Sequence, residues 1–263
     1  MKRLRHHLPL LVTVLLSSAA LRYGPIAQLA DYHDFADQST LAGLPHAADV
    51  LSNAGFALIA LWGWRRLSAA RQHPALRHGW GGYRLFLAGL FFTAIGSSFY
   101  HLAPDNARLV WDRLPIALAC AGLLAGVRGD ARRQDSSAPA AWLALYAVAS
   151  VAWWHVTETA GAGDLRPYLL LQALPMLLVP LWLWIHKMPR ADCRAFGGAL
   201  LLYAIAKLAE LNDHRIAALT GALTGHTLKH LLAGAAAALI IARLAQRTQE
   251  HHESKIGRDH AQK

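Results

Sequence analysis

Hydrophobic residues are concentrated in long runs, which are separated by short connections that hold most of the charged residues. Each run has about 15 to 20 residues, and a helix of about 20 apolar residues crosses a hydrocarbon core of about 30 Å. The runs are 8–22, 47–64, 84–102, 107–127, 139–156, 167–186, 195–211 and 226–243. A soluble core does not need repeated runs of this length. The pattern therefore predicts an all-α membrane protein with several spanning helices.

The first run, 8–22, has features that the other runs lack. Its basic start, apolar centre and small residues at 17–20 are typical of a signal peptide, and they also fit an uncleaved membrane anchor. Removal of residues 1–20 is left open, and both outcomes place residues 24–46 outside the cytoplasm. The chain is predicted to divide into an N-terminal hydrophobic segment (1–23), a seven-helix membrane domain (24–245) and a polar, disordered cytoplasmic tail (246–263).

The 26 Lys and Arg residues are distributed unevenly between the connections. Most fall on alternate connections, namely Lys2, Arg3, Arg5, Arg65, Arg66, Arg71, Arg77, Arg84, Arg128, Arg132, Arg133, Lys187, Arg190, Arg194, Arg243, Arg247, Lys255, Arg258 and Lys263. A basic excess marks the cytoplasmic side of a membrane, so the C-terminus is predicted to be cytoplasmic. A net charge of +10 could suggest nucleic-acid binding, but that needs a basic patch on one folded face. The alternating distribution argues against it.

Three histidines occupy apolar helices at the same predicted depth. His101 ends the outward run 84–102, and His226 and His230 open the inward run 226–243, so all three are expected near the outer surface. Residues four apart lie on one helix face, which lets His226 and His230 bind one ion. Three imidazoles with an open fourth position are typical of a catalytic zinc site. The pattern therefore predicts a zinc site at the outer side.

Two further polar residues are predicted at this depth. Ser97 lies one turn before His101, and Asp112 begins the following inward helix. Ser97 could hold a water or donate to an oxyanion, and Asp112 could orient a ligand or act as a general base. The alternative is that these residues only form hydrogen bonds between helices. Asp112 could also simply pair with the adjacent Arg113.

Two lysines lie near these positions. Lys207 and Glu210 are three apart on a helix and are expected to neutralise each other. Lys229 lies between the two histidines of the last helix, but about 100° from His230 around the helix axis. Its side chain is therefore expected to point away from the site or to pair with an acidic residue.

Three motifs together resemble the alkaline ceramidase family. They are Gly96-Ser97-Ser98-Phe99-Tyr100-His101-Leu102-Ala103-Pro104-Asp105-Asn106, Trp111-Asp112-Arg113-Leu114-Pro115 and His226-Thr227-Leu228-Lys229-His230. The family belongs to a wider group of seven-helix membrane hydrolases that share a Ser-x-x-x-His helix, an Asp on the next helix and a final His-x-x-x-His helix. The resemblance covers nearly the whole chain after about residue 30.

The resemblance implies zinc-dependent hydrolysis of the amide bond of a ceramide-like lipid at the outer side of the membrane, releasing a fatty acid and a sphingoid base. His101, His226 and His230 would bind zinc, and Ser97 and Asp112 would complete the catalytic group. The substrate would be a lipid within the bilayer. The protein would be an integral multi-pass protein of a bacterial-type inner membrane.

An acidic segment precedes the second run. It contains Asp31, Asp34 and Asp37, and clustered oxygen ligands suit calcium, although helix caps and solvated loops have the same composition. The resemblance implies calcium as a second metal in this segment, with Asp34 and Asp37 as ligands. The next acidic position of the family's motif falls on His46, so the chain departs from the family pattern there.

Other functions stay open on these patterns. The enzyme could hydrolyse another N-acyl lipid, because generic Leu, Ala and Trp residues would line its tail pocket. A seven-helix receptor-like protein could instead hold zinc structurally. A proton-coupled transporter is less well supported, because the polar groups cluster at one end and form no path through the bilayer. Acyl length and oligomeric state are not specified. Cys120 and Cys193 lie in different regions and indicate no disulfide framework.

Overall fold

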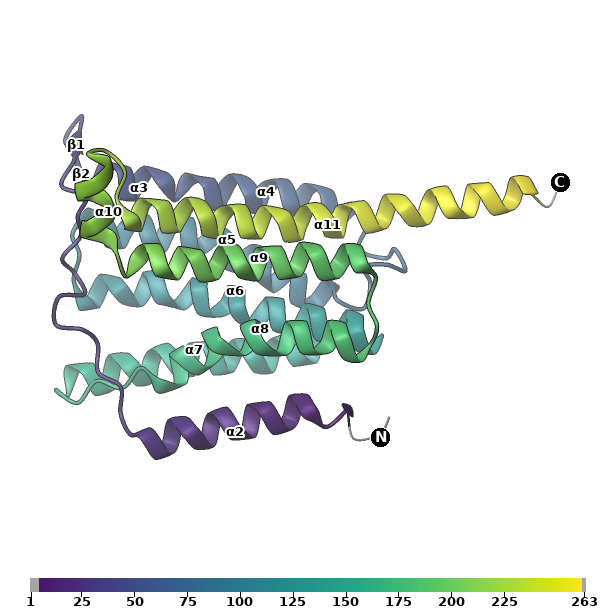
Figure 1. The fold of residues 1–263 in the computed structure, drawn as a ribbon, viewed down its shortest axis with the longest axis horizontal. Coiled ribbons are helices and arrows are strands. Elements are labelled where there is room, and N and C mark those ends of the chain that lie inside the picture. Colours follow the sequence, from purple (N-terminus) through teal and green to yellow (C-terminus); the bar gives the residue numbers. More distant parts are fainter. Residues whose placement is uncertain (1–4, 262–263) are drawn as a thin grey trace.

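The structure is a computed structural model that describes residues 5–261, with side chains described up to residue 250. Its helices run back and forth between the two ends of a bundle (Figure 1). The helices are α2 (Leu8–Tyr23), α3 (Ala47–Ser52), α4 (Ala54–Ala69), α5 (Trp80–Leu102), α6 (Asn106–Arg132), α7 (Ser137–Thr159), α8 (Arg166–Ile185), α9 (Arg190–Glu210), α10 (Asp213–Thr220) and α11 (Gly225–Ala261). Each apolar run coincides with one of these helices or helix pairs, so the prediction of a largely helical chain is confirmed.

Five of the described helices are long and apolar enough to cross a membrane: α5, α6, α7, α8 and α11. A sixth span results if α9 and α10, which meet at a bend of 83°, count as one. The run predicted at 47–64 is divided at Asn53 into α3 and α4, and α4 alone has 16 residues. The helices therefore indicate a multi-pass membrane protein, with five or six spans by length and composition.

A short β-hairpin lies outside the all-α prediction. Strand β1 (Thr40–Leu41) pairs antiparallel with β2 (Leu44–Pro45) through a two-residue turn. The turn residues have positive φ angles, 50° at Ala42 and 84° at Gly43, as a type I′ turn requires. The fold is therefore helical with one small hairpin, and this hairpin leads directly into α3.

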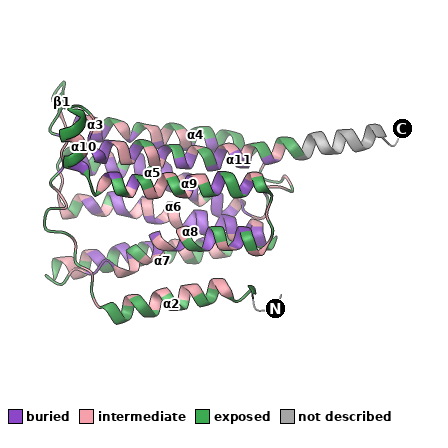
Figure 2. Cartoon of the chain, in the orientation of Figure 1, coloured by how far each residue is buried: buried purple, intermediate pink, exposed green. Residues whose placement is uncertain are grey.

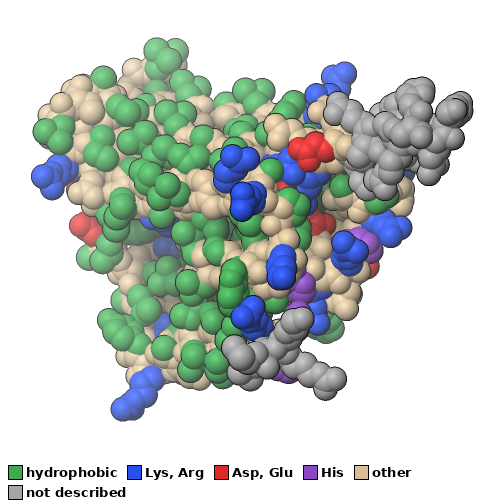
Figure 3. Space-filling view, turned by 45° about the vertical axis from the view of Figure 1, so that its right-hand side comes forward, with side chains coloured by type: hydrophobic (Ala, Val, Ile, Leu, Met, Phe, Trp, Pro, Cys, Tyr) green, Lys and Arg blue, Asp and Glu red, His purple; other side chains and the backbone are tan. Residues whose placement is uncertain are grey.

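The two ends of the bundle differ in their contents. Helix α5 ends and α11 begins at the end that carries α3, α10 and the hairpin, whereas α2 begins and α11 leaves the bundle at the opposite end (Figure 1). Lys and Arg side chains gather toward that opposite end, and hydrophobic side chains cover much of the flank (Figure 3). The alternation of basic connections along the sequence predicts this arrangement, because helices that span in turn bring alternate connections to one end.

Burial separates central from peripheral helices. In the most apolar 18-residue stretch of α6, 67% of the residues are buried, whereas in that of α7 only 28% are. Helix α6 therefore lies at the centre of the bundle and α7 at its edge (Figure 2). Large apolar side chains remain exposed on the peripheral helices, including Leu15, Leu58, Trp142 and Val156. A bilayer would cover such side chains, which are unusual in this number on a soluble protein.

Glycines allow α5 and α6 to approach each other closely. A Cβ atom on Gly82 would overlap the backbone nitrogen of Gly126, and one on Gly122 would overlap the backbone nitrogen of Phe86. Small residues at helix contacts are typical of membrane helices, because packing and not hydrophobic exclusion drives their association. This helix pair is the scaffold on which Ser97, His101 and Asp112 are placed.

Gly82→Ala is expected to destabilise the protein by about 1–3 kcal/mol, the usual cost of inserting atoms into a packed core. The matched control is Gly197→Ala on α9, where nothing lies within 4 Å of the added Cβ and the helix propensity of alanine favours the change by about 1 kcal/mol. Thermal unfolding in detergent compares the two variants. A Gly82→Ala protein as stable as Gly197→Ala would contradict the close α5–α6 contact.

At the basic end, ion pairs tie α11 to its neighbours. Arg247 bonds Asp130 on α6 at 2.6 Å and Asp192 on α9 at 3.0 Å, and Arg243 bonds Asp192 at 2.6 Å. The polar tail predicted from residue 246 begins within this helix, because residues 246–250 are helical. Residues 262–263 of that tail lie outside the described residues, as do residues 1–4 of the N-terminal segment.

Candidate metal centre

Three buried histidines come together where α5 ends and α11 begins. His101 lies in the last turn of α5, and His226 and His230 occupy the first two turns of α11. One nitrogen from each ring lies within 4.8 Å of the others, and all three side chains are at most 4% exposed. The structure thus brings together the three histidines that the sequence singled out.

The donor set fits a zinc ion. Zn–N bonds of about 2.0–2.1 Å place the nitrogens around a tetrahedral zinc about 3.3 Å apart, so small ring rotations from a spread of 4.8 Å suffice. Nδ1 of His101 is buried without a hydrogen-bond partner among the described residues, which is uncommon for a buried polar atom. Imidazole ligands suit zinc, whereas calcium and magnesium prefer oxygen ligands.

Two residues of α3 lie next to the rings of His101 and His230. Ser52 Oγ lies 2.8 Å from His230 Nδ1, which leaves Nε2 of His230 as the ligand atom. Asp49 Oδ2 lies 3.9 Å from His101 Nδ1, which is too far for a hydrogen bond, so Asp49 acts on this ring only through its charge. Asp49 Oδ1 accepts a 2.6 Å hydrogen bond from Thr227 on α11. Such outer partners fix the tautomer and orientation of metal-binding imidazoles. We therefore regard Ser52 as a positioning residue through its hydrogen bond and Asp49 as one through its charge. Neither was predicted from the sequence as part of the zinc site.

Asp49→Asn is expected to weaken zinc binding about 10- to 100-fold, the usual cost of changing an outer partner of a metal ligand. The amide keeps the size of the side chain but removes the charge that favours a well-oriented His101. Competition with a chelator measures the zinc affinity of the purified protein. Asp34→Asn is the control, because Asp34 is 69% exposed and pairs with His214. Equal affinities in all three proteins would remove Asp49 from the site.

The N-terminal segment closes over the histidines. The ring of Phe35 lies 4.6 Å from the His101 ring and 4.5 Å from the His226 ring, centroid to centroid. Asp213 holds the segment there, because its Oδ2 accepts a hydrogen bond from the Ala36 amide and its Oδ1 accepts one from the His226 amide. Phe35 therefore excludes water from one side of the cluster. Nothing in its local sequence signals this role.

The acidic side chains of that segment do not gather around one point. Asp34 lies 3.4 Å from His214 on α10, whereas Asp37 is buried and accepts hydrogen bonds from the Ser39 and Asp49 amides at 3.0 and 2.8 Å. Burial raises the pKa of Asp37, but these hydrogen bonds outweigh it and hold the pKa below its usual value. Within the described part of the chain, only the three histidines form a group of three or more His, Cys, Asp or Glu side chains that could hold a metal ion. Calcium binding by Asp34 and Asp37 stays a prediction.

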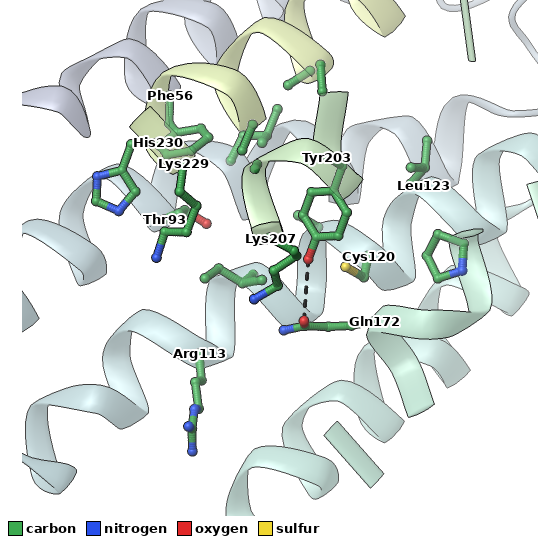
Figure 4. Close-up of a pocket in the computed structure, with 18 of the residues that line it drawn as sticks. Phe56, Thr93, Arg113, Cys120, Leu123, Gln172, Tyr203, Lys207, Lys229 and His230 are labelled. Atoms are coloured by element: carbon green, nitrogen blue, oxygen red, sulfur yellow. Dashed lines mark hydrogen bonds between the residues drawn. The ribbon is translucent and has the colours of Figure 1, made fainter. Parts of the chain in front are cut away.

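Ser97 and Asp112 reach the same place from neighbouring helices. A Cβ on Gly96 would overlap the backbone oxygen of Trp111, so α5 and α6 touch through their backbones beside both residues. Ser97 and Asp112 are 2% and 6% exposed, so both side chains are buried. Both line a cavity of about 240 Å³ whose wall also includes His230 (Figure 4).

The wall of this cavity is mostly apolar. Side chains from α4, α5, α6, α8, α9 and α11 contribute to it, among them Phe56, Leu90, Leu123, Leu200 and Ile240. Ligand sites commonly combine an apolar lining with a few convergent polar groups that fix orientation. The cavity therefore has the general form of a site for a largely apolar ligand, with Ser97 and Asp112 among its few polar groups.

Ion pairs form the polar part of the cavity wall. Lys207 and Lys229 bond the two carboxylate oxygens of Glu210 at 2.7 and 2.9 Å, so the predicted pairing of Lys207 with Glu210 is confirmed. Lys229 pairs with an acidic residue as expected, but it also lies 2.7 Å from His226 Nε2. This contact competes with a metal ion at Nε2 of His226. The ammonium group of Lys229 can keep its ion pair with Glu210 when it leaves His226.

Comparison of the chain with protein-family models, with curated proteins and with solved structures finds no match in any of the three.

Proposed function

We propose that this chain is a zinc-dependent membrane hydrolase that cleaves the amide bond of a ceramide-like lipid, as the resemblance to the alkaline ceramidase family implies. One observation carries the proposal: His230, a member of the buried cluster of three histidines, lines the same apolar cavity as Ser97 and Asp112. The products would be a fatty acid and a sphingoid base.

The reaction adds water across the C–N bond of the amide. A zinc ion held by His101, His226 and His230 would supply Lewis acidity toward the carbonyl oxygen and lower the pKa of a water molecule. Asp112 accepts a proton from the attacking water and returns it to the nitrogen of the leaving amine. Ser97 donates a hydrogen bond to the oxygen that becomes negative at the tetrahedral stage. The apolar walls hold the acyl chain and exclude bulk water.

The proposed topology has seven spans and one additional N-terminal helix. Helices α3 and α4 together cover residues 47–69 and form a short span interrupted at Asn53, while α2 is the additional helix. The basic end faces the cytoplasm by the positive-inside rule. This orientation puts the C-terminus in the cytoplasm and the histidines at the outer side of a bacterial-type inner membrane.

The arrangement favours an enzyme over a receptor-like protein with structural zinc. A structural site needs the histidines, but it does not need a buried serine and a buried aspartate at the wall of a cavity. Structural zinc sites also usually have four protein ligands, whereas three histidines leave a position open. The presence of Ser97 and Asp112 therefore supports a catalytic role for the zinc, with water or substrate at the open fourth position.

The test pairs metal content with lipid hydrolysis in the purified, full-length protein. We expect about one zinc per chain, as a three-histidine site holds, and fatty-acid release from ceramides that stops after chelation and returns when zinc is added. A panel of ceramides and other N-acyl lipids identifies the substrate. Release from other N-acyl lipids alone would correct the substrate class. Stoichiometric zinc without hydrolysis of any lipid amide would contradict the proposal and favour a structural metal.

A further inference from the structure

One buried cation in the cavity wall, Arg113, forms no ion pair with any acidic side chain that the structure describes. Arg113 on α6 is 2% exposed, and its Nε and Nη1 atoms have no hydrogen-bond partner among the described residues. The pairing with Asp112 that the sequence allowed is not formed. A charge taken out of water without a partner costs several kcal/mol, and ionisable side chains within a membrane tend to mark functional sites.

Aromatic rings hold the Arg113 guanidinium in place. Its Cζ atom lies 4.0 Å from the centroid of a Trp154 ring, 4.9 Å from that of Tyr32 and 5.4 Å from that of Tyr168. Cation–π contacts contribute about 0.5–2 kcal/mol, which offsets only part of the desolvation cost. They act through the faces of the rings, so the N–H groups at the edge of the guanidinium keep their capacity to donate. The side chain is held by the rings, while Nε and Nη1 have no hydrogen-bond partner among the described residues.

Arg113 belongs to the same cavity as the proposed catalytic residues. Arg113 lines it together with Ser97 and Asp112, and its side chain extends from α6 apart from the pair formed by Tyr203 and Gln172 (Figure 4). One ligand in the cavity could therefore contact both the proposed catalytic residues and the guanidinium of Arg113.

The charge of the cavity favours an anion. Its wall contains three cationic side chains, Arg113, Lys207 and Lys229, and two acidic ones, Asp112 and Glu210. Glu210 is occupied by both lysines, so neither lysine needs a ligand and Arg113 remains. A planar guanidinium matches carboxylate and phosphate oxygens through two parallel hydrogen bonds.

We infer that Arg113 binds a carboxylate or phosphate group at the polar end of the lipid that occupies this cavity. The inference rests on the proposed function for the identity of the ligand as an acyl lipid, and it narrows the substrate class. The anionic group has two possible sources. It is the head group of an acidic N-acyl lipid, such as an N-acyl amino acid, or the carboxylate of the released fatty acid.

Two matched ligand pairs test this in the full-length protein in detergent, through equilibrium binding and thermal stabilisation at a pH where the acids are ionised. N-oleoylglycine is compared with N-oleoylethanolamine, and oleate is compared with oleyl alcohol. We expect the acidic member of at least one pair to bind about 10- to 100-fold more tightly, the range that charge-assisted hydrogen bonds give. A preference within the first pair assigns the anion to the head group, and a preference within the second pair alone assigns it to the product.

Variants of Arg113 test whether this residue causes the preference for the acidic ligand. Arg113→Met should abolish it, and Arg113→Lys should retain part of it because the charge remains without the fork. Arg108→Met is the control, since Arg108 lies on the same helix, is 35% exposed and pairs with Asp105. Equal binding of both members in both pairs by the wild-type protein would overturn the inference, even if the Arg113 variants do not fold.

Binding does not require turnover, so the inference and the proposed function fail separately. The binding measurements are repeated with Ser97→Ala, in which hydrolysis is expected to be slow. An acidic preference that depends on Arg113, in a protein that hydrolyses no lipid amide, supports the anion site and contradicts only the hydrolase. Hydrolysis of ceramides without any acidic preference supports the hydrolase and overturns the anion site.

Discussion

Replacing His226 with alanine is expected to reduce bound zinc to background and to abolish hydrolysis of lipid amides. His226 is one of only three nitrogen ligands in the cluster, so its loss leaves two imidazoles to hold the ion. The decrease in zinc affinity should exceed the roughly 10- to 100-fold that changing an outer partner costs. Mass spectrometry gives zinc per chain, and fatty-acid release from the substrate panel gives the activity of the same preparation.

The His226 experiment needs a matched histidine and a check of folding. His214→Ala serves as the control, because His214 lies at the same end of the bundle but is 60% exposed and pairs with Asp34. It should keep both zinc and activity. The backbone amide of residue 226 still donates to Asp213 in the variant, so helix α11 should keep its start. Full zinc content in a folded His226→Ala protein would show that the zinc binds elsewhere or that His226 is not needed to hold it.

The histidine cluster could be predicted because two regularities act together. Helical periodicity places His226 and His230 on one face of α11. Alternation of spans then brings the end of α5, with His101, to the same end as the start of α11. Neither regularity depends on side-chain detail, so residues that are more than a hundred positions apart in the sequence could be placed together before the structure was known.

The residues around the cluster could not be found in this way. Asp49 and Ser52 contact the rings because α3 is a separate short helix that ends before Asn53, and an apolar run gives no sign of such a break. Phe35 covers the cluster because Asp213 holds its segment in place, a contact between residues far apart in sequence. These features depend on tertiary contacts that no local pattern encodes.

The surroundings of Lys229 and Asp37 depend on details that helix angles and composition do not contain. The angle of about 100° around the axis separates Lys229 from His230, but Lys229 is three residues after His226, and that spacing makes neighbours. A long, flexible lysine then reaches the ring. For the acidic segment, composition could not say that the oxygens of Asp37 are taken by backbone amides. The number of acidic residues alone therefore does not tell which carboxylate oxygens remain available to a metal ion.

Ser97→Ala is expected to lower kcat about 100- to 1000-fold while leaving zinc content and thermal stability nearly unchanged. The hydroxyl is assigned to the oxyanion, and loss of one such donor typically has this effect. Asp112→Asn should lower kcat by about 100- to 10,000-fold, as loss of a general base does. Steady-state hydrolysis, metal content and thermal unfolding are measured on each protein.

The adjacent serine provides the control that makes this prediction specific. Ser98 has the same chemistry on the same helix, but its hydroxyl donates to the backbone oxygen of Val50 at 3.2 Å, and it does not line the cavity. Ser98→Ala should therefore keep its activity. If Ser97→Ala and Ser98→Ala behave alike, the hydroxyl of Ser97 only joins helices, as serines in membranes often do. If Ser97→Ala alone loses activity with its zinc still bound, metal binding and catalysis are separate properties of neighbouring residues on one helix, which a purely structural zinc site does not predict.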